Sequence, residues 1–364
     1  MDFQTRFPTL DREVADVLFT WPPPPETTPT IEEMRAATDF YSERMKEVYK
    51  QDMPSDSEYR VEDRMIAVEG GEILVRCLIP TPISGELTRS YPLMVWYHGG
   101  GYYLGSIQTD DYFLRKICVN HRIVILNVEY RLAPEFPFPI GLNDAYDSLK
   151  WSIENGSSFN ISLNQGFLVG GCSAGANYAA SVVIRARDDP FFTERQVTGQ
   201  FLQMPQVLHP DAIIPMEYKT QLLSMSENAN APLLTREDIN RSLTTLNVDP
   251  NDTRFSVLLA PDHKCLPAVY FQISGADPLR DEGLLYEKIL KAAGVPTKLD
   301  QYPGFPHAGH YALSSVALAK KLYKDFELGV DWLLKTPKKT SSSVLLSSDR
   351  ADGRAIKDSS FEGN

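Results

Sequence analysis

The stretch "VGGCSAGANYAA", residues 169–180, decides the fold of this chain. Its first residues end an apolar run of strand length, and the alanine-rich part after Ser173 begins a helical pattern. Because Gly171 and Gly175 flank Ser173, the chain can pass from a strand into a helix through a tight turn. Two interpretations are open at this point. Either Ser173 is an activated nucleophile, or the small residues only allow the strand and the helix to pack closely.

Short apolar runs alternate with helical patterns along the rest of the chain. Runs rich in Val and Ile, without strict alternation, are typical of strands buried on both faces of a parallel sheet. The predicted strands, after a hairpin over 65–79 with its turn at Gly70 and Gly71, are 91–98, 122–130, 166–171, 199–205, 267–274 and 297–303. The predicted helices include 144–153, 174–187, 281–293 and 311–334. This alternation predicts an α/β protein with a doubly wound, mostly parallel sheet.

Two segments interrupt the alternation and suggest further parts. Residues 1–60 carry helical patterns broken by a run of prolines, and we expect an N-terminal helical cap segment there. Residues 207–262 are polar and contain several prolines, and an insertion of this length between two strands is typical of a cap or lid over a site. Residues 61–206 and 263–335 then form the core. Residues 336–364, rich in Ser, Lys and Asp, are predicted to be a disordered tail.

Composition excludes several classes of function. A net charge of −12 argues against a nucleic-acid partner, because phosphate binding depends on clustered Lys and Arg. The sequence lacks an apolar run long enough to span a bilayer, and its first residues lack the pattern of a secretory signal. The cysteines, which form no CxxC pair and predict free thiols rather than a metal site, are Cys77, Cys118, Cys172 and Cys265. We therefore expect a cytoplasmic protein without a bound metal; a homodimer is one option for its oligomeric state.

A glycine-rich loop supports the nucleophile interpretation. The segment "HGGGYYLGS", residues 98–106, directly follows the predicted strand "LMVWY". Loops at the carboxyl ends of parallel strands are where α/β proteins place their sites, and glycines leave the backbone N–H groups unobstructed. Gly99 and Gly100, together with Ala174, are therefore the expected donors of an oxyanion hole. The alternative is a flexible glycine turn.

Two further loops supply the partners that a nucleophilic serine requires. Asp277 opens "DPLRDEG" after one predicted strand, and His307 lies in "YPGFPHAGHYAL" after the next. The chain order Ser173, Asp277, His307 is the order of the catalytic triad in α/β-hydrolases. His310, close by, is the reserve candidate for the catalytic histidine.

At these residues the chain resembles the hormone-sensitive lipase branch of the α/β-hydrolases, also called the type IV esterase or plant carboxylesterase group. The resemblance covers roughly residues 60–334, and its motifs are HGGG (98–101), "VEYRLAPEFPFP" (128–139), "GCSAGAN" (171–177), "DPLRDEG" (277–283) and the histidine turn (304–307). It implies an α/β-hydrolase fold with an eight-stranded sheet flanked by helices and a helical cap. Family members commonly follow the catalytic histidine with Gly-Phe, whereas this chain has Ala308 and Gly309. In this family Glu135 and Asp144 are scaffold residues.

The resemblance also implies a mechanism and a class of substrate. Ser173, His307 and Asp277 would act as nucleophile, base and orienting carboxylate in the hydrolysis of a small to medium acyl ester, without a cofactor. The N-terminal region resembles fungal members that hydrolyse acetyl or similar esters of polyketide-type secondary metabolites. Tyr102 and Tyr103 are candidate substrate-binding residues, although core packing explains aromatic residues equally well. Cys172 is expected to be a small buried residue rather than a second nucleophile.

Two other functions remain open from the sequence. The same triad could serve lactone opening, acyl transfer or elimination on a small-molecule ester or lactone. A non-catalytic ligand receptor, as in relatives with a broken triad, is less well supported, because Ser173, Asp277 and His307 are all present.

Overall fold

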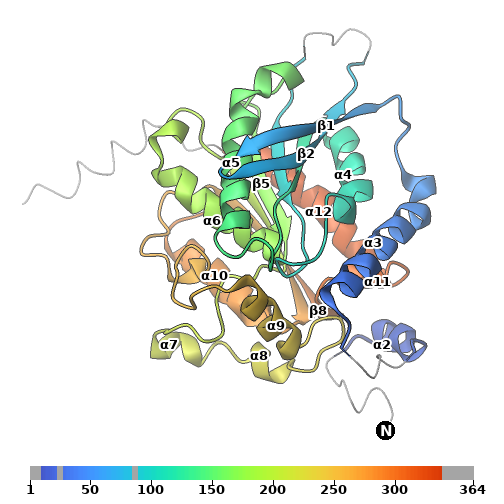
Figure 1. Ribbon diagram of the computed structural model, residues 1–364, viewed down its shortest axis with the longest axis vertical. Coiled ribbons are helices and arrows are strands. Elements are labelled where there is room, and N and C mark those ends of the chain that lie inside the picture. Colours follow the sequence, from blue (N-terminus) through green and yellow to red (C-terminus); the bar gives the residue numbers. More distant parts are fainter. Residues whose placement is uncertain (1–9, 23–27, 84–88, 338–364) are drawn as a thin grey trace, which may run out of the picture.

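The fold is built on one eight-stranded sheet with helices on both faces (Figure 1). The computed structural model describes residues 10–22, 28–83 and 89–337. The strands are β1 (Tyr59–Val68), β2 (Gly71–Pro80), β3 (Leu93–Tyr97), β4 (Val124–Glu129), β5 (Phe167–Cys172), β6 (Gly199–Gln203), β7 (Ala268–Ala276) and β8 (Thr297–Pro306). Their order across the sheet is β1-β2-β4-β3-β5-β6-β7-β8. This confirms the expected α/β-hydrolase fold.

The sheet is antiparallel at one edge and parallel elsewhere. The β1–β2 hairpin confirms the predicted turn, with Gly70 at φ 74° and Val68 paired with Gly71. β2 then pairs antiparallel with β4, while every pair from β3–β4 to β7–β8 is parallel. As a result, the carboxyl ends of β3, β5, β6, β7 and β8 meet along one edge of the sheet.

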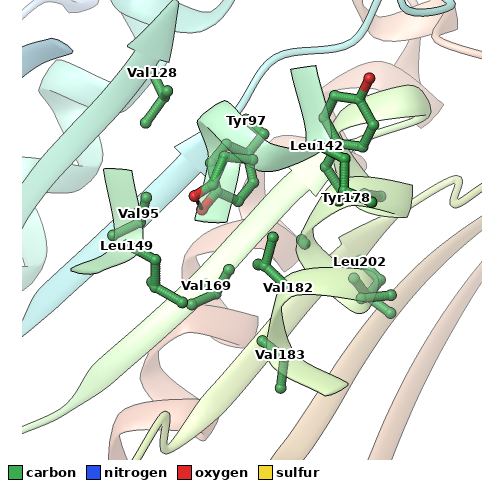
Figure 2. Close-up of a cluster of buried hydrophobic side chains, with 14 of the residues drawn as sticks. Val95, Tyr97, Val128, Leu142, Leu149, Val169, Tyr178, Val182, Val183 and Leu202 are labelled. Atoms are coloured by element: carbon green, nitrogen blue, oxygen red, sulfur yellow. Dashed lines mark hydrogen bonds between the residues drawn. The ribbon is translucent and has the colours of Figure 1, made fainter. Parts of the chain in front are cut away.

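Side chains from the central strands divide between two cores. In β3, Val95 and Tyr97 face the core beneath α5 and α6, whereas Met94 and Trp96 face the core beneath α4 and α12. Such a strand has to be apolar on both faces, which explains why strict alternation was absent from the sequence. Figure 2 shows the first core, where Val95, Val169 and Leu202 of the sheet lie among side chains of α5 and α6.

The helices agree with the sequence prediction except at two places. The longer ones are α2 (Arg12–Phe19), α3 (Ile31–Val48), α4 (Gln108–His121), α5 (Ile140–Glu154), α6 (Ala174–Asp188), α9 (Arg236–Leu246), α10 (Arg280–Ala292) and α12 (Ala317–Lys335). The sequence analysis did not identify α4. The single helix predicted over 311–334 was wrong, because the chain forms α11 (Gly309–Ala312) and then α12, with extended backbone at Val316 between them.

The two segments that interrupt the alternation are both helical where the structure describes them. Residues 207–262 contain α7 (Met216–Lys219), α8 (Ser224–Glu227) and α9, and the N-terminal part contains α2 and α3. A reciprocal capping box between Thr30 and Glu33 starts α3. The predicted tail, 336–364, lies almost entirely outside the described residues.

One arginine fastens α3 to the core. The Arg35 guanidinium donates to both carboxylate oxygens of Glu135, each at 2.8 Å, and to the backbone carbonyls of Tyr103 and Ala133, each at 2.9 Å. These four hydrogen bonds tie an N-terminal helix to the loop after HGGG and to the "YRLAPE" segment. The "YRLAPE" segment therefore anchors the N-terminal helix as well as supporting the site loops.

The Arg35–Glu135 pair predicts a pH-dependent stability. Arg35 holds the pKa of Glu135 at about 2, below its usual value, so the pair stabilises the fold above the ordinary glutamate pKa and stops doing so as pH falls toward 2. Glu135→Gln should lower the free energy of unfolding by about 1 kcal/mol at pH 7, because the pair is partly exposed. Denaturant melts from pH 7 to pH 3 should show this difference shrinking below about pH 4.5.

Glu47→Gln is the matched control, because it removes the same charge from an exposed ion pair between Glu47, on α3, and Lys50, just after the helix. It should cost a few tenths of a kcal/mol. Equal losses in the two variants would contradict an anchoring role for Glu135.

Candidate active site

Ser173 occupies a strained turn between β5 and α6. Its backbone has φ 54° and ψ −116°, a conformation that non-glycine residues rarely adopt. The two flanking glycines are sterically required: a Cβ at Gly171 would lie 2.4 Å from the carbonyl carbon of Gly175, and a Cβ at Gly175 would lie 2.0 Å from the carbonyl oxygen of Tyr97. The sharp turn leaves the Ser173 side chain partly exposed at the edge of a buried sheet.

The structure brings the three predicted triad residues into contact. His307 Nε2 lies 2.9 Å from Ser173 Oγ, and His307 Nδ1 lies 2.7 Å from Asp277 Oδ2. Asp277 directly follows β7 and His307 directly follows β8, so both loops leave the same edge of the sheet as the Ser173 turn. Both side chains are buried, and Asp277 Oδ1 also accepts the N–H of Leu279 at 2.8 Å, which fixes the carboxylate. An imidazole held in this way can take a proton from Ser173.

The predicted donor loop lies against this turn. Gly100 has φ 128°, and a Cβ there would lie 2.1 Å from the carbonyl oxygen of Leu104, so only glycine fits. Gly99 approaches the carbonyl of Cys172, and both glycines share a cavity with Ser173. Ala174 is the first residue of α6, where the N–H has no partner within the helix.

His98 and Tyr130 support the glycine loop, a role that the sequence analysis did not assign. His98 Nδ1 lies 2.8 Å from the carbonyl oxygen of Gly99, to which it donates, and the His98 ring stacks on Tyr130 at 4.3 Å. The Tyr130 hydroxyl donates to the His98 carbonyl at 2.7 Å. Burial lowers the pKa of His98 to about 4, so this histidine is neutral at pH 7.

A second buried network lies beside the turn. Asp110 accepts hydrogen bonds from Trp96 Nε1 and from the Tyr311 hydroxyl, each at 2.7 Å. Cys172, next to Ser173, is fully buried, and burial raises the pKa of its thiol well above the usual range. A thiol that stays protonated is a poor nucleophile, which agrees with the expected structural role of Cys172.

A cavity of about 450 Å³ opens above Ser173. Its walls come from α3, the glycine loop, α9 and the segment around α11, and α3 packs against α11 (Figure 1). Tyr103 lines this cavity, as expected of a substrate-binding residue. Tyr102 does not: it is buried behind the loop, and its hydroxyl donates to Gln206 Oε1 at 3.1 Å. We therefore withdraw Tyr102 as a substrate contact.

His310, the reserve histidine, does not reach Ser173. It is buried against Tyr311 and is not among the residues that line the cavity. Burial lowers the pKa of His310 to about 3, and its Nδ1 has no hydrogen-bond partner in the described part of the chain.

The described residues offer neither a metal site nor a membrane span. No cluster of three or more His, Cys, Asp or Glu side chains there has an arrangement that could hold a metal ion. Among the helices in those same ranges, none combines the length and the apolar character needed to cross a bilayer.

A serine, a histidine and an aspartate in contact at the carboxyl edge of such a sheet define a serine hydrolase of the α/β-hydrolase fold, and comparisons with known proteins agree. The family model for the alpha/beta hydrolase fold matches residues 94–311. The chain belongs to this family, in its hormone-sensitive lipase-like, type IV esterase branch. By family it is a carboxylesterase-like serine ester hydrolase.

Individual relatives cover most of the chain. An AB hydrolase superfamily protein of Schizosaccharomyces pombe is 34% identical over 92% of this chain and 96% of that protein. A versiconal hemiacetal acetate esterase of Dothistroma septosporum is 33% identical over 69% of this chain and 76% of that esterase. Among solved structures, a vibralactone cyclase superposes with a TM-score of 0.87 at 41% identity, covering 90% of this chain and 95% of the cyclase.

The two histidines can be separated by mutation. His307→Ala should lower kcat for nitrophenyl acetate by about four to six orders of magnitude, because the base beside the nucleophilic serine is lost. His310→Phe should retain most of the activity, because it replaces a buried, partly unpaired side chain with an apolar one. Steady-state kinetics on both purified variants test this, after thermal melts confirm that each is folded. If His310→Phe were the inactive variant, His310 and not His307 would be the catalytic histidine.

Proposed function

We propose that the chain hydrolyses a small to medium acyl ester with Ser173 as nucleophile, His307 as general base and Asp277 as the group that orients the imidazole. The continuous contact from Asp277 through His307 to Ser173, at 2.7 and 2.9 Å, carries this proposal. His307 takes the Ser173 proton as Oγ attacks the acyl carbonyl, and then gives it to the departing alcohol. Water, deprotonated by His307, then attacks the acyl-enzyme and releases the acid.

The glycine loop supplies the electrostatic part of the mechanism. We assign the N–H groups of Gly99, Gly100 and Ala174 as donors to the oxyanion of the tetrahedral intermediate. The turn fixes their position before the substrate arrives, and each such donor typically contributes roughly 3 kcal/mol of transition-state stabilisation. His98 and Tyr130 hold the loop without touching the substrate.

The cavity sets the class of substrate. Its volume of about 450 Å³ is that of a pocket for a small organic molecule, and its walls are mainly apolar, as an acyl ester requires. We propose that the described part of residues 1–60, together with 207–262, forms the cap over it, through α3 and α9. The likeness to acetate esterases of fungi supports an acetyl or similar ester of a polyketide-type secondary metabolite as substrate.

A second candidate reaction uses the same residues. The likeness to a vibralactone cyclase favours acyl transfer within one molecule, in which a hydroxyl of the bound acyl group replaces water and closes a lactone ring. The same steps in reverse open a lactone. Hydrolysis and ring closure differ only in whether the oxygen of water or that of the acyl group's own hydroxyl attacks the acyl-enzyme.

Serine chemistry is tested by removing the nucleophile. Ser173→Ala should lower kcat for nitrophenyl acetate and butyrate by about four to six orders of magnitude, because the covalent route is lost. A well-folded Ser173→Ala protein with wild-type turnover would refute the proposal, and tight binding of substrate without turnover by the wild type would favour a receptor.

Isotope incorporation separates hydrolysis from lactone formation. In water enriched in ¹⁸O, hydrolysis places one labelled oxygen in the released acid, whereas ring closure places none in the product. Mass spectrometry of products from a plain acetate and from an ester with a hydroxylated acyl chain should show label in the first product. An unlabelled cyclic product from the second would establish the acyl-transfer reaction.

A further inference from the structure

One face of α9 brings two charged side chains into the cavity. Asp238, Arg241 and Ser242 all line it, and among the described lining residues Asp238 is the only carboxylate and Arg241 the only guanidinium or lysine. Their side chains are 34% and 29% exposed, so a bound molecule can reach both. Neither takes part in the chemistry proposed for Ser173. Their presence in a mainly apolar cavity therefore calls for another role.

Asp238 is held in place by the start of its own helix. The N–H and the hydroxyl of Thr235 donate to Asp238 Oδ2 at 3.0 and 2.6 Å, in a reciprocal capping box. Asp238 Oδ1 accepts from Arg241 Nη1 at 3.1 Å. The carboxylate cannot turn away without losing the cap, so the ion pair has a defined orientation.

The pair lines the same cavity as Ser173 and His307. Ser242, next to Arg241, contacts the glycine loop so closely that a Cβ at Gly101 would lie 3.2 Å from the Ser242 Cβ. Arg241 also interacts with the hydroxyl of Tyr103. Burial raises the pKa of this phenol, and the charge of Arg241 partly offsets the rise. A ligand group at the pair therefore belongs to the molecule whose ester lies at Ser173.

The available hydrogen-bonding positions select one kind of ligand group. Asp238 Oδ1 retains one lone pair, and Arg241 retains N–H groups that donate to no carboxylate or carbonyl within the described residues. An anion would be repelled by Asp238, and a carbonyl or ether would leave the remaining lone pair of Asp238 Oδ1 without a donor. A hydroxyl group can donate to Asp238 and accept from Arg241 at once. The surrounding Met34, Tyr103 and Ile239 provide an apolar wall suited to an aromatic ring.

We propose that Asp238 and Arg241 form a specificity subsite for a hydroxyl group on the substrate, and that the preferred substrates are hydroxyl-bearing aryl esters. This inference rests on the proposed ester hydrolysis and names the substrate class of that same site. The pair contacts the part of the substrate away from the scissile bond, so it selects the substrate and does not take part in bond breaking.

The experiment compares three acetates that differ at one ring position: phenyl, 3-methoxyphenyl and 3-hydroxyphenyl acetate. Each kcat/KM is divided by the rate of hydroxide-catalysed hydrolysis of the same ester, which removes differences in leaving-group reactivity. The wild-type enzyme should prefer the hydroxyl ester to the methoxy ester by about tenfold, the effect of one well-placed hydrogen bond to a charged group. Arg241→Met should bring this ratio to about one, and Asp238→Asn should lower it.

Arg236→Met is the matched control, because it removes the same charge from α9 at a residue that does not line the cavity. It should keep the wild-type ratio. Asp238→Asn retains an oxygen for the Thr235 cap, and thermal melts establish that each variant is folded. If Asp238→Asn does not fold, the Arg241→Met variant alone decides the test.

Two results would overturn the subsite. One is a corrected wild-type ratio of about one. The other is an equal loss on all three esters in Arg241→Met, which indicates a structural role. Neither result touches the proposed function, which fails separately if Ser173→Ala hydrolyses the three esters like the wild type.

Discussion

The close approach of β5, α6 and the end of β3 is the constraint on which the rest of the site depends. Gly175 lies so near the carbonyl of Tyr97, and Gly171 so near Gly175, that no side chain fits at either position. This contact forces Ser173 into its positive-φ conformation and places its hydroxyl beside the glycine loop after β3. The backbone strain at one residue is outweighed by the packing of three buried elements around it.

The parallel sheet extends this constraint to the other reacting groups. Because β7 and β8 run parallel to β5, the residues that follow them leave the sheet on the side where Ser173 stands. Asp277 and His307 therefore reach Ser173 from loops that are far away in sequence. The strands thus position the reacting side chains, whereas helices form the walls of the cavity around them.

Much of the core and of the reacting triad could be predicted from the sequence, because strand runs, glycine turns and chain order are local signals. Helix α4 could not be predicted, because its buried face includes the charged residues Asp110 and Asp111. Their partners, Trp96 on β3 and Arg76 on β2, are distant in sequence. Tyr102 and Tyr103 could not be separated either. Only the folded chain shows that Tyr103 lines the cavity, whereas Tyr102 is buried and bonds to Gln206. Cavity residues on α3 and α9 gave no signal, since nothing local connects them to Ser173.

The division of the cavity between strands and helices affects how the protein can change. The groups around Ser173 are fixed by backbone contacts that tolerate no added atom, whereas α3 and α9 contribute side chains such as Met34, Thr38 and Ile239 that point into open volume. Substitutions at these three positions can accumulate without altering the reacting geometry. Substrate range and chemistry are thus separable traits in this molecule. A directed-evolution library restricted to the cavity-lining positions of α3 and α9 would explore new substrates while most of its members still fold.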